Sequence, residues 1–178
     1  LWPLHQAGKL KRVIASTYQS ASGAGRPAMD ELEEATRAYL KGERYEPKVL
    51  PHPYAFNLFS HNTTIGEDGY NGEEQKVVKE LRKIMGLPEL RVGVTCVRVP
   101  VLRAHSMAIT AEFADKVSVD AARAVLSKAP GVKIVDDRAK NHFPMPVESR
   151  GQYDVLVGQI REDVSDPTGH SLALFISG

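Results

Sequence analysis

The sequence predicts an α+β fold in which a mixed, largely antiparallel β-sheet carries helices on one face. Strand-like runs outnumber helix-like runs, and the two kinds do not alternate strictly along the chain, as they would in a fold built from βαβ units. The composition is that of an ordinary globular protein, with 42% hydrophobic and 25% charged residues. A length of 178 residues is enough for one core, so we expect a single domain over residues 1–178.

The first part of the chain is predicted to contain the end of a helix, a strand and a second helix. Residues 1–8 are typical of a helix capped by a glycine, and residues 12–18 form a β-rich run that leads into a glycine loop. Pro27 suits the first turn of a helix that continues over residues 29–40. The apolar face of this helix consists of Leu32, Ala35, Thr36, Tyr39 and Leu40.

A long connection follows, over residues 43–70, without a clear hydrophobic period and with three prolines. Connections of this length inside a compact domain usually belong to a functional site or an interface. Within it, residues 54–61 are strongly apolar. We expect this segment to be buried, either in the core or against another subunit.

The second half of the chain is predicted to supply most of the sheet. Asn71 is typical of a helix N-cap, and Glu74 three residues later completes a capping box. The apolar stripe of that helix consists of Val77, Val78, Leu81, Ile84 and Met85. Strands are expected over residues 90–101, 105–114, 153–162 and 170–177, with a helix over 118–128 and a short strand over 132–135.

The candidate chemistry centres on Arg98 and His105, which lie on either side of Pro100 at the end of a predicted strand. Arginine keeps its charge and can bind a planar carboxylate through two parallel hydrogen bonds. Histidine can accept and release a proton near neutral pH. An isolated pair of this kind is more often a surface charge and an unrelated histidine, so its interpretation depends on the other polar motifs of the chain.

Three further segments contain residues suited to a ligand site. Residues 16–25, with the sequence STYQSASGAG, combine polar side chains with glycines that allow close backbone approach. Glu73 and Lys76 lie in the first turn of a predicted helix, although an acidic residue there also simply favours the helix dipole. Residues 57–62, with the sequence NLFSHN, would on their own be interpreted as a loop. Arg98 and His105 alone provide the minimum of an active site, with one group to hold an acidic substrate and one to move a proton.

Several other classes of function are not expected. The formal net charge is +1 without a cluster of lysine and arginine, so nucleic acid is not an expected partner. The six histidines show no metal-ligand spacing, and one cysteine forms neither a disulfide nor a cysteine-based zinc site, so no metal is expected. No apolar run is long enough for a membrane span. Cys96, in the middle of a predicted strand, is expected to be a small buried hydrophobe rather than a nucleophile.

The order and spacing of these motifs resemble the second domain of aspartate-β-semialdehyde dehydrogenase over essentially all 178 residues. The resemblance is carried by the STYQSASGAG loop, the YAFNLFSHN stretch, the Asn-x-Glu-Glu-x-Lys helix start at Asn71 and the CVRVPVLRAHS segment from Cys96. Residues 129–132, 136–138 and 143–146 also resemble this family, in particular its plant-type members. The fold implied is that of the carboxy-terminal domain of enzymes similar to glyceraldehyde-3-phosphate dehydrogenase.

Enzymes of this family interconvert L-aspartyl 4-phosphate and L-aspartate 4-semialdehyde with NADP and phosphate, through a cysteine thioester. The resemblance implies that Arg98 pairs with the substrate α-carboxylate and Glu73 with its α-ammonium group, while Lys76 helps to hold phosphate. It further implies that His105 is the general acid/base and that Gln19 orients the reacting group. The residues implied to approach the nicotinamide of NADP are Ser22 and Gly23.

The family's nucleophile motif, Asn-Cys-(Ser/Thr)-Thr, precedes a helix that ends in Pro-Leu-His, and here Trp2-Pro-Leu-His5 stands at the start. The motif, the amino-terminal dinucleotide-binding domain and a closing carboxy-terminal helix are therefore expected to lie outside residues 1–178. We expect the isolated chain to be inactive and to form a homodimer, and expect the protein in the bacterial cytoplasm or in a plastid.

Two alternatives remain open from the sequence. The chain could be a non-catalytic structural or assembly module derived from this domain, acting through its subunit interface. It could also belong to the related N-acetyl-glutamyl-phosphate reductases. The implied pairing of Glu73 and Arg98 with a free amino acid argues against the latter, because an acetylated amine needs no carboxylate partner.

Overall fold

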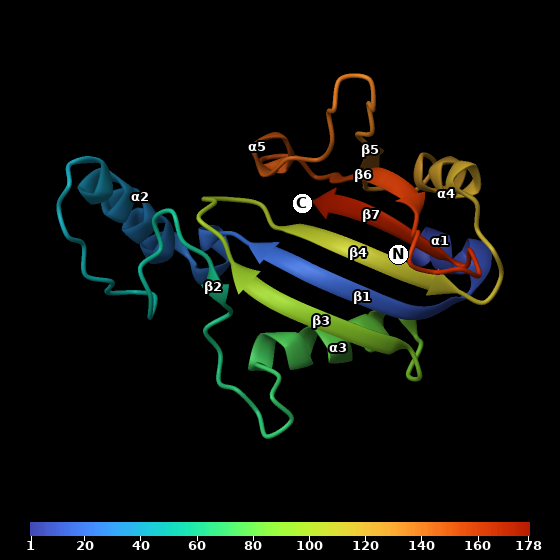
Figure 1. Cartoon of the computed structure of the whole chain (residues 1–178), viewed down its shortest axis with the longest axis horizontal. Helices are drawn as coiled ribbons and strands as arrows, with labels where there is room; N and C mark the ends of the chain where they lie inside the picture. The colour runs from blue at the N-terminus through green and yellow to red at the C-terminus, as the bar shows by residue number, and fades with distance from the viewer.

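The computed structural model describes residues 1–178 and contains one seven-stranded sheet in the order β2-β3-β1-β4-β7-β6-β5 (Figure 1). The strands are β1 (Leu10–Gln19), β2 (Phe59–Ser60), β3 (Arg91–Arg98), β4 (Ser106–Phe113), β5 (Val132–Ile134), β6 (Val155–Glu162) and β7 (Ser171–Ser177). β1 pairs with β3 and β5 with β6 in parallel, whereas every other neighbouring pair is antiparallel. The predicted fold class, α+β with a mixed and largely antiparallel sheet, is confirmed.

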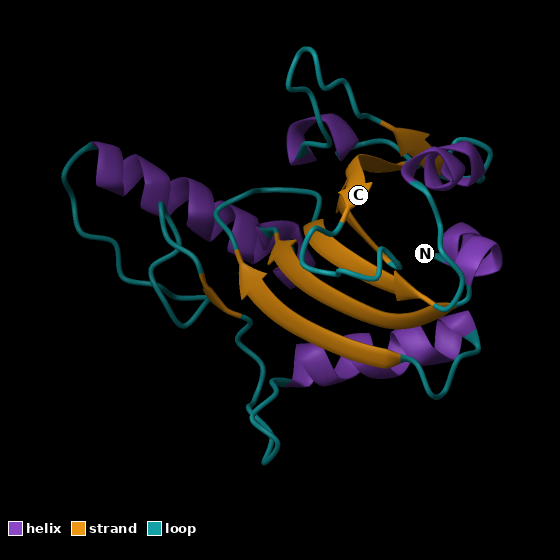
Figure 2. Cartoon of the chain, turned by 45° about the vertical axis from the view of Figure 1, so that its right-hand side comes forward, coloured by secondary structure: helices purple, strands orange, loops and turns teal.

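Three helices share the main core on one face of the sheet (Figure 2). They are α1 (Trp2–Gly8), α3 (Gly72–Met85) and α4 (Val119–Leu126). Leu4, Met85 and Leu126 from these helices pack with inward-facing strand residues such as Val13 and Ala111. A short fifth helix, α5 (Pro146–Ser149), was not predicted from the sequence, and neither was the two-residue strand β2. No helix is both long enough and apolar enough to cross a membrane.

Helix α2 (Arg26–Leu40) projects beyond the end of the sheet (Figure 1) and forms a second, smaller core. It follows the 3-10 turn η1 (Ala21–Ala24), which replaces the predicted glycine loop. Leu32 packs there with Tyr54 and Phe59 from the long connection. The helix therefore anchors that connection beside the end of β1.

The other face of the central strands is open. Along β1, Val13 and Ala15 are buried, while the alternate residues Ile14 and Tyr18 are 41% and 37% exposed. The rings of Tyr18 and Phe175 lie 6.2 Å apart on this open face. An apolar sheet surface of this kind is unusual on a free monomer and suits a partner.

The predicted signals at the starts of α2, α3 and α4 are confirmed. The Asn71 side chain accepts the Glu74 backbone N–H at 2.9 Å, and the Glu74 carboxylate accepts the Asn71 N–H at 2.9 Å, which completes the capping box of α3. Ser118 caps α4 through the backbone N–H of Ala121. Pro27 lies in the first turn of α2. Side-chain hydrogen bonds therefore fix the starts of α3 and α4, whereas α2 begins at a proline without a side-chain cap.

Some predicted apolar faces are wrong in part. Tyr39 and Leu40 are 63% and 74% exposed because the end of α2 extends past its small core. Ile84 of α3 is 78% exposed because it faces away from the sheet, whereas Met85 is buried. Helix α1 ends at Gly8, and its left-handed C-cap residue is Lys9 rather than the predicted Gly8.

The apolar segment over residues 54–61 is buried only at some positions, which corrects the prediction. Tyr54, Phe59 and His61 are buried, while Phe56 and Leu58 are each 61% exposed. The Phe56 ring packs on Tyr39 of α2, with ring centroids 4.5 Å apart. Both rings remain largely in solvent, so half of this segment is available to a partner.

Candidate active site

Strand pairing brings the predicted site residues to one edge of the sheet. Gln19 and Arg98 are the last residues of the parallel neighbours β1 and β3, and they are partners in the register. β4 runs antiparallel to β1 and begins at Ser106, so His105 enters the same edge. The first turn of α3 contributes Glu73, whose carboxylate reaches Gln19. Groups far apart in the sequence therefore share one site.

Arg98 is a buried cation without an ionic partner. Its side chain is surrounded by neutral acceptors: the Asn62 side-chain oxygen at 3.3 Å from Nε, the Ser20 carbonyl oxygen at 3.3 Å from Nη1, and the ring nitrogen Nε2 of His61 at 2.9 Å from Nη2. Burial lowers the pKa of Arg98, but an arginine remains charged at neutral pH. A buried charge is costly unless an opposite charge compensates it. The guanidinium is therefore suited to an anionic ligand.

His105 is held through its Nδ1 atom. The backbone N–H of Ser20 donates to Nδ1 at 3.2 Å, and the Ser20 hydroxyl lies 3.0 Å from the same atom. Accepting the backbone N–H favours the neutral tautomer with its proton on Nε2. Burial, followed by the nearby charge of Arg98, lowers the pKa of His105. The imidazole is therefore neutral near pH 7, with Nε2 free of these contacts.

Glu73 lies between an amide and an ammonium group. The Gln19 side-chain amide donates to Oε1 at 3.2 Å, and the Lys76 Nζ atom lies 3.4 Å from Oε2. Partial burial alone would raise the pKa of Glu73, but the charge of Lys76 and the Gln19 hydrogen bond outweigh it and lower the pKa. Thr17 donates to Gln19 at 3.1 Å and orients the amide. The carboxylate is thus ionised and available to a cationic group.

Glu73 and Glu74 are adjacent, but they act differently. Glu74 is buried and accepts the backbone N–H groups of Asn71 and Cys96, both at 2.9 Å. These bonds tie the start of α3 to β3. Glu74 therefore holds the helix in place, which leaves Glu73 to face the site.

Gly23 occupies the narrowest point of the site. A β-carbon at this residue would lie 3.0 Å from both Cε1 and Nε2 of His105 and 3.3 Å from Nη1 of Arg98. Ser22, one residue earlier, is partly exposed, and its hydroxyl lies 3.0 Å from that of Ser20. The absence of a side chain at Gly23 keeps the imidazole and the guanidinium accessible together.

The only thiol of the chain lies close to Thr17 and Glu74 but is shielded from the site by burial. Cys96 is fully buried in β3, as predicted, and burial raises the pKa of its thiol. Thiolates are the reactive form of cysteine, so this environment disfavours a nucleophilic role. No group of three or more His, Cys, Asp or Glu side chains is arranged to hold a metal ion.

Several residues that contact the site were not given a role from the sequence, namely Thr17, Ser20, His61 and Asn62. Ser20 acts through its backbone N–H, its carbonyl and its hydroxyl, and His61 acts through its ring. The sequence signal for His61 was its place in the apolar stretch that carries the family resemblance. Ser20 gave no signal, because backbone groups are the same in every residue.

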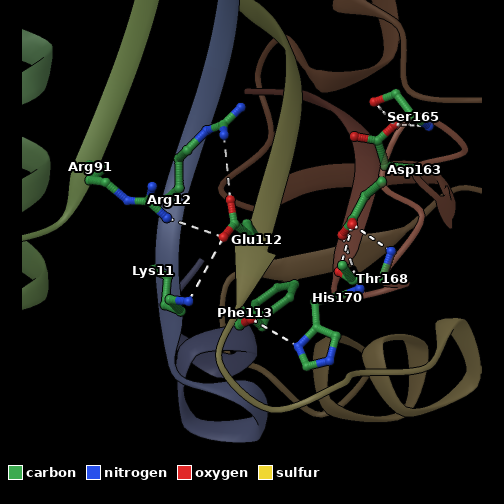
Figure 3. Close-up of polar contacts among 10 residues, drawn as sticks. Lys11, Arg12, Arg91, Glu112, Phe113, Asp163, Ser165, Thr168 and His170 are labelled. Carbon is green, nitrogen blue, oxygen red and sulfur yellow. Dashed lines mark hydrogen bonds and ion pairs between the residues drawn. The ribbon is translucent and has the colours of Figure 1, made fainter.

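A second polar cluster lies elsewhere on the sheet, at the start of β1 (Figure 3). Glu112 is surrounded there by Lys11, Arg12 and Arg91 at 4.0, 3.5 and 3.1 Å. The neighbouring turn is closed by Asp166, whose pKa is lowered by hydrogen bonds, the largest from Thr168. The cavity between them, about 270 Å³, has polar walls whose groups already bond one another. Exposed ion pairs of this kind contribute little to stability, and the hydrogen bonds of Asp166 stay within its own turn.

Comparison with known proteins identifies the family. The family description "Semialdehyde dehydrogenase, dimerisation domain" matches residues 1–178, so the chain belongs to the semialdehyde dehydrogenases and spans their dimerisation domain. The aspartate-semialdehyde dehydrogenase of Synechocystis sp. is 51% identical over 174 residues, covering 98% of this chain and 52% of the relative. The chain therefore spans about half the length of the curated relatives it matches.

Solved structures agree with this assignment. The crystal structure of aspartate semialdehyde dehydrogenase II from Vibrio cholerae, complexed with ASA, superposes with a TM-score of 0.93 at 32% identity, over 99% of this chain and 51% of that one. The Candida albicans aspartate semialdehyde dehydrogenase, solved with NADP, gives a TM-score of 0.67 at 22% identity, over 99% of this chain and 48% of that one. The latter likeness concerns the fold alone.

Proposed function

We propose that this chain is the substrate-binding and subunit-pairing part of an NADP-dependent aspartate-semialdehyde dehydrogenase. The observation that carries the proposal is the buried guanidinium of Arg98, which has only neutral hydrogen-bond partners and lies with the His105 ring beside Gly23, while Glu73 contacts the neighbouring Gln19. An arginine and a glutamate at one site suit the carboxylate and the ammonium group of a free amino acid.

In the proposed reaction, L-aspartyl 4-phosphate is reduced to L-aspartate 4-semialdehyde with release of phosphate. A hydride from NADPH and a cysteine thiolate, both supplied from outside residues 1–178, provide the redox and nucleophilic chemistry. Arg98 binds the α-carboxylate through its two free N–H groups, and Glu73 binds the α-ammonium group. Lys76, which is exposed beside Glu73, adds positive charge for the phosphate group.

His105 is proposed to handle the proton. With Nδ1 accepting the Ser20 N–H, its Nε2–H can donate to the substrate oxygen as negative charge develops there. Gln19, fixed by Thr17 and Glu73, orients the reacting group. Ser22 and Gly23 lie at the accessible side of the imidazole, where the nicotinamide would approach.

Kinetics of two variants of the complete enzyme test these roles. Arg98→Lys should raise KM for the amino-acid substrate at least tenfold, because a single ammonium group cannot replace the two-pronged contact. His105→Asn should mainly lower kcat, because it removes the proton carrier. Wild-type parameters in both variants would contradict the assignment of the site.

The open sheet face and the exposed residues Phe56 and Leu58 are the proposed surface for a second copy of this chain. Light scattering should therefore give the mass of a homodimer. These features also favour the second candidate function, a non-catalytic assembly module. A complete protein that dimerises but lacks semialdehyde dehydrogenase activity would favour that alternative.

A further inference from the structure

His61 is a buried histidine that the proposed chemistry does not use. It is 8% exposed, and its Nε2 atom lies 2.9 Å from Nη2 of Arg98. A guanidinium has only donors, so Nε2 must present its lone pair and the ring must be neutral, with its proton on Nδ1. The Thr63 hydroxyl oxygen lies 3.4 Å from Nδ1 and can accept a hydrogen bond from Nδ1–H.

The backbone fixes this ring beside the strand that carries Arg98. β2 pairs with the end of β3, and Phe59 lies opposite Arg98. His61 follows two residues after Phe59. The His61 backbone N–H donates to the Cys96 carbonyl at 2.9 Å, which extends the pairing. Thr63 in turn accepts the backbone N–H of Glu73 at 3.0 Å. One connected set of contacts thus links both proposed substrate-binding charges.

The contacts of Arg98 leave a defined pair of donors free. Of the five N–H groups of a guanidinium, three are taken, by Asn62, Ser20 and His61. Two N–H groups remain free, one on Nη1 and one on Nη2. These two donors are what a carboxylate needs for a bidentate contact.

We propose that His61 is a positioning residue that orients the Arg98 guanidinium for the substrate carboxylate without neutralising its charge. This role rests on the function proposed above for Arg98. A carboxylate in place of His61 would hold the guanidinium as firmly, but it would compete with the substrate for the same charge. A neutral acceptor fixes the orientation and leaves the charge available.

Burial and the surrounding charges lower the pKa of His61 and favour its neutral form. Burial is the main cause that lowers its pKa, and the charge of Arg98 lowers it further. Lys76 and His105 act in the same direction, and only Glu73 opposes them. Protonation would remove the acceptor and place a second cation against the guanidinium.

Two substitutions in the complete enzyme separate positioning from general packing. In His61→Gln the amide can place an oxygen near the former Nε2, whereas the shorter side chain in His61→Asn reaches only the former Nδ1 position. We expect His61→Asn to raise KM for the amino-acid substrate about tenfold with kcat changed less than about threefold, and His61→Gln to keep KM within about threefold of wild type. An equal KM increase in both variants, or a loss confined to kcat, would contradict the positioning role.

The Arg98→Lys background separates this inference from the proposed function. If Arg98→Lys alone leaves KM unchanged, the proposed function fails. Suppose instead that Arg98→Lys raises KM and that His61→Asn raises KM a further tenfold in the Arg98→Lys background. His61 would then not act through Arg98, and only the inference would fail. We expect less than about a twofold additional effect, because lysine offers no two-pronged contact to orient.

A pH profile covers the case in which His61→Asn does not fold. In the wild-type enzyme KM should rise as pH falls through the lowered pKa of His61. In His61→Gln this rise in KM should be absent, while the pH dependence of kcat that is due to His105 should remain. A KM rise of the same size in His61→Gln would overturn the proposal.

Discussion

The Gly23→Ala substitution tests whether His105 and Arg98 act from the positions they occupy here. The new β-carbon would lie 3.0 Å from two ring atoms of His105 and 3.3 Å from Nη1 of Arg98. Favourable contacts between such atoms are about 3.5–4.0 Å. The imidazole would therefore have to move by a few tenths of an ångström.

A displacement of this size should affect turnover far more than folding. A misplacement of about 1 Å can cost about a hundredfold in rate, so we expect this smaller shift to lower kcat by about three- to tenfold. Gly23 is exposed and does not have a left-handed backbone, so the free energy of unfolding should change by less than about 1 kcal/mol.

Steady-state kinetics and chemical denaturation of the complete enzyme provide the assay. Gly72→Ala is a matched control, because its β-carbon would lie 3.4 Å from the nearest atom, Cβ of Thr63, which is an ordinary contact. We expect this control to keep kcat within about twofold. A wild-type kcat in Gly23→Ala would show that the imidazole does not need its present position, and the reasoning would be refuted.

Three further predictions follow from individual contacts. Glu74→Ala should lower the free energy of unfolding by about 3 kcal/mol, because two buried backbone N–H groups lose their acceptor. The control Glu80→Ala, at an exposed position of the same helix, should change it by less than about 0.5 kcal/mol. Equal changes for the two variants in urea denaturation would disprove this prediction. Tyr18→Asp should shift the mass measured by light scattering from dimer towards monomer, and an unchanged dimer would move the interface elsewhere. Because the pKa values of His61 and His105 are lowered in the folded state, the unfolded chain binds protons more readily, so stability should decrease as pH falls below about 6.5. Denaturation at pH 5.5 showing higher stability than at pH 7.5 would contradict that sign.

Local signals in the sequence predicted most of the elements. Asn71, with Glu74 three residues later, predicted the start of α3, and the side chains form the expected reciprocal bonds. Alternation and β-rich runs predicted the long strands. These signals depend on neighbours within a few residues, which is why they could be read without the fold.

Pairing between distant segments could not be predicted in the same way. β1 and β3 are parallel neighbours, although α2, the long connection and α3 separate them in the chain. Hydrophobic periodicity shows which face of a strand is apolar, but it does not show which strand lies beside it. The contact of Arg98 with Ser20 depends on this pairing, and its contact with His61 depends on the pairing of β2 with β3, so both partners became visible only in the structure.

The exposed apolar residues have a related explanation. Tyr39, Leu40 and Ile84 fit a helical period, but no element of this chain covers them. A period reports the direction in which a side chain points, whereas burial depends on what lies there. The same limit applied to the open face of β1, where alternation alone did not distinguish solvent from a partner.

The central claim is that Arg98 and Glu73 bind the two charged ends of one amino-acid substrate. A crystal structure of the complete enzyme with aspartate semialdehyde tests it most directly. We predict that the carboxylate oxygens lie within about 3.2 Å of Nη1 and Nη2 of Arg98, with the ammonium group at the Glu73 carboxylate. A substrate whose carboxylate is held by other residues, with the guanidinium still bound only to its neutral partners, would contradict the account.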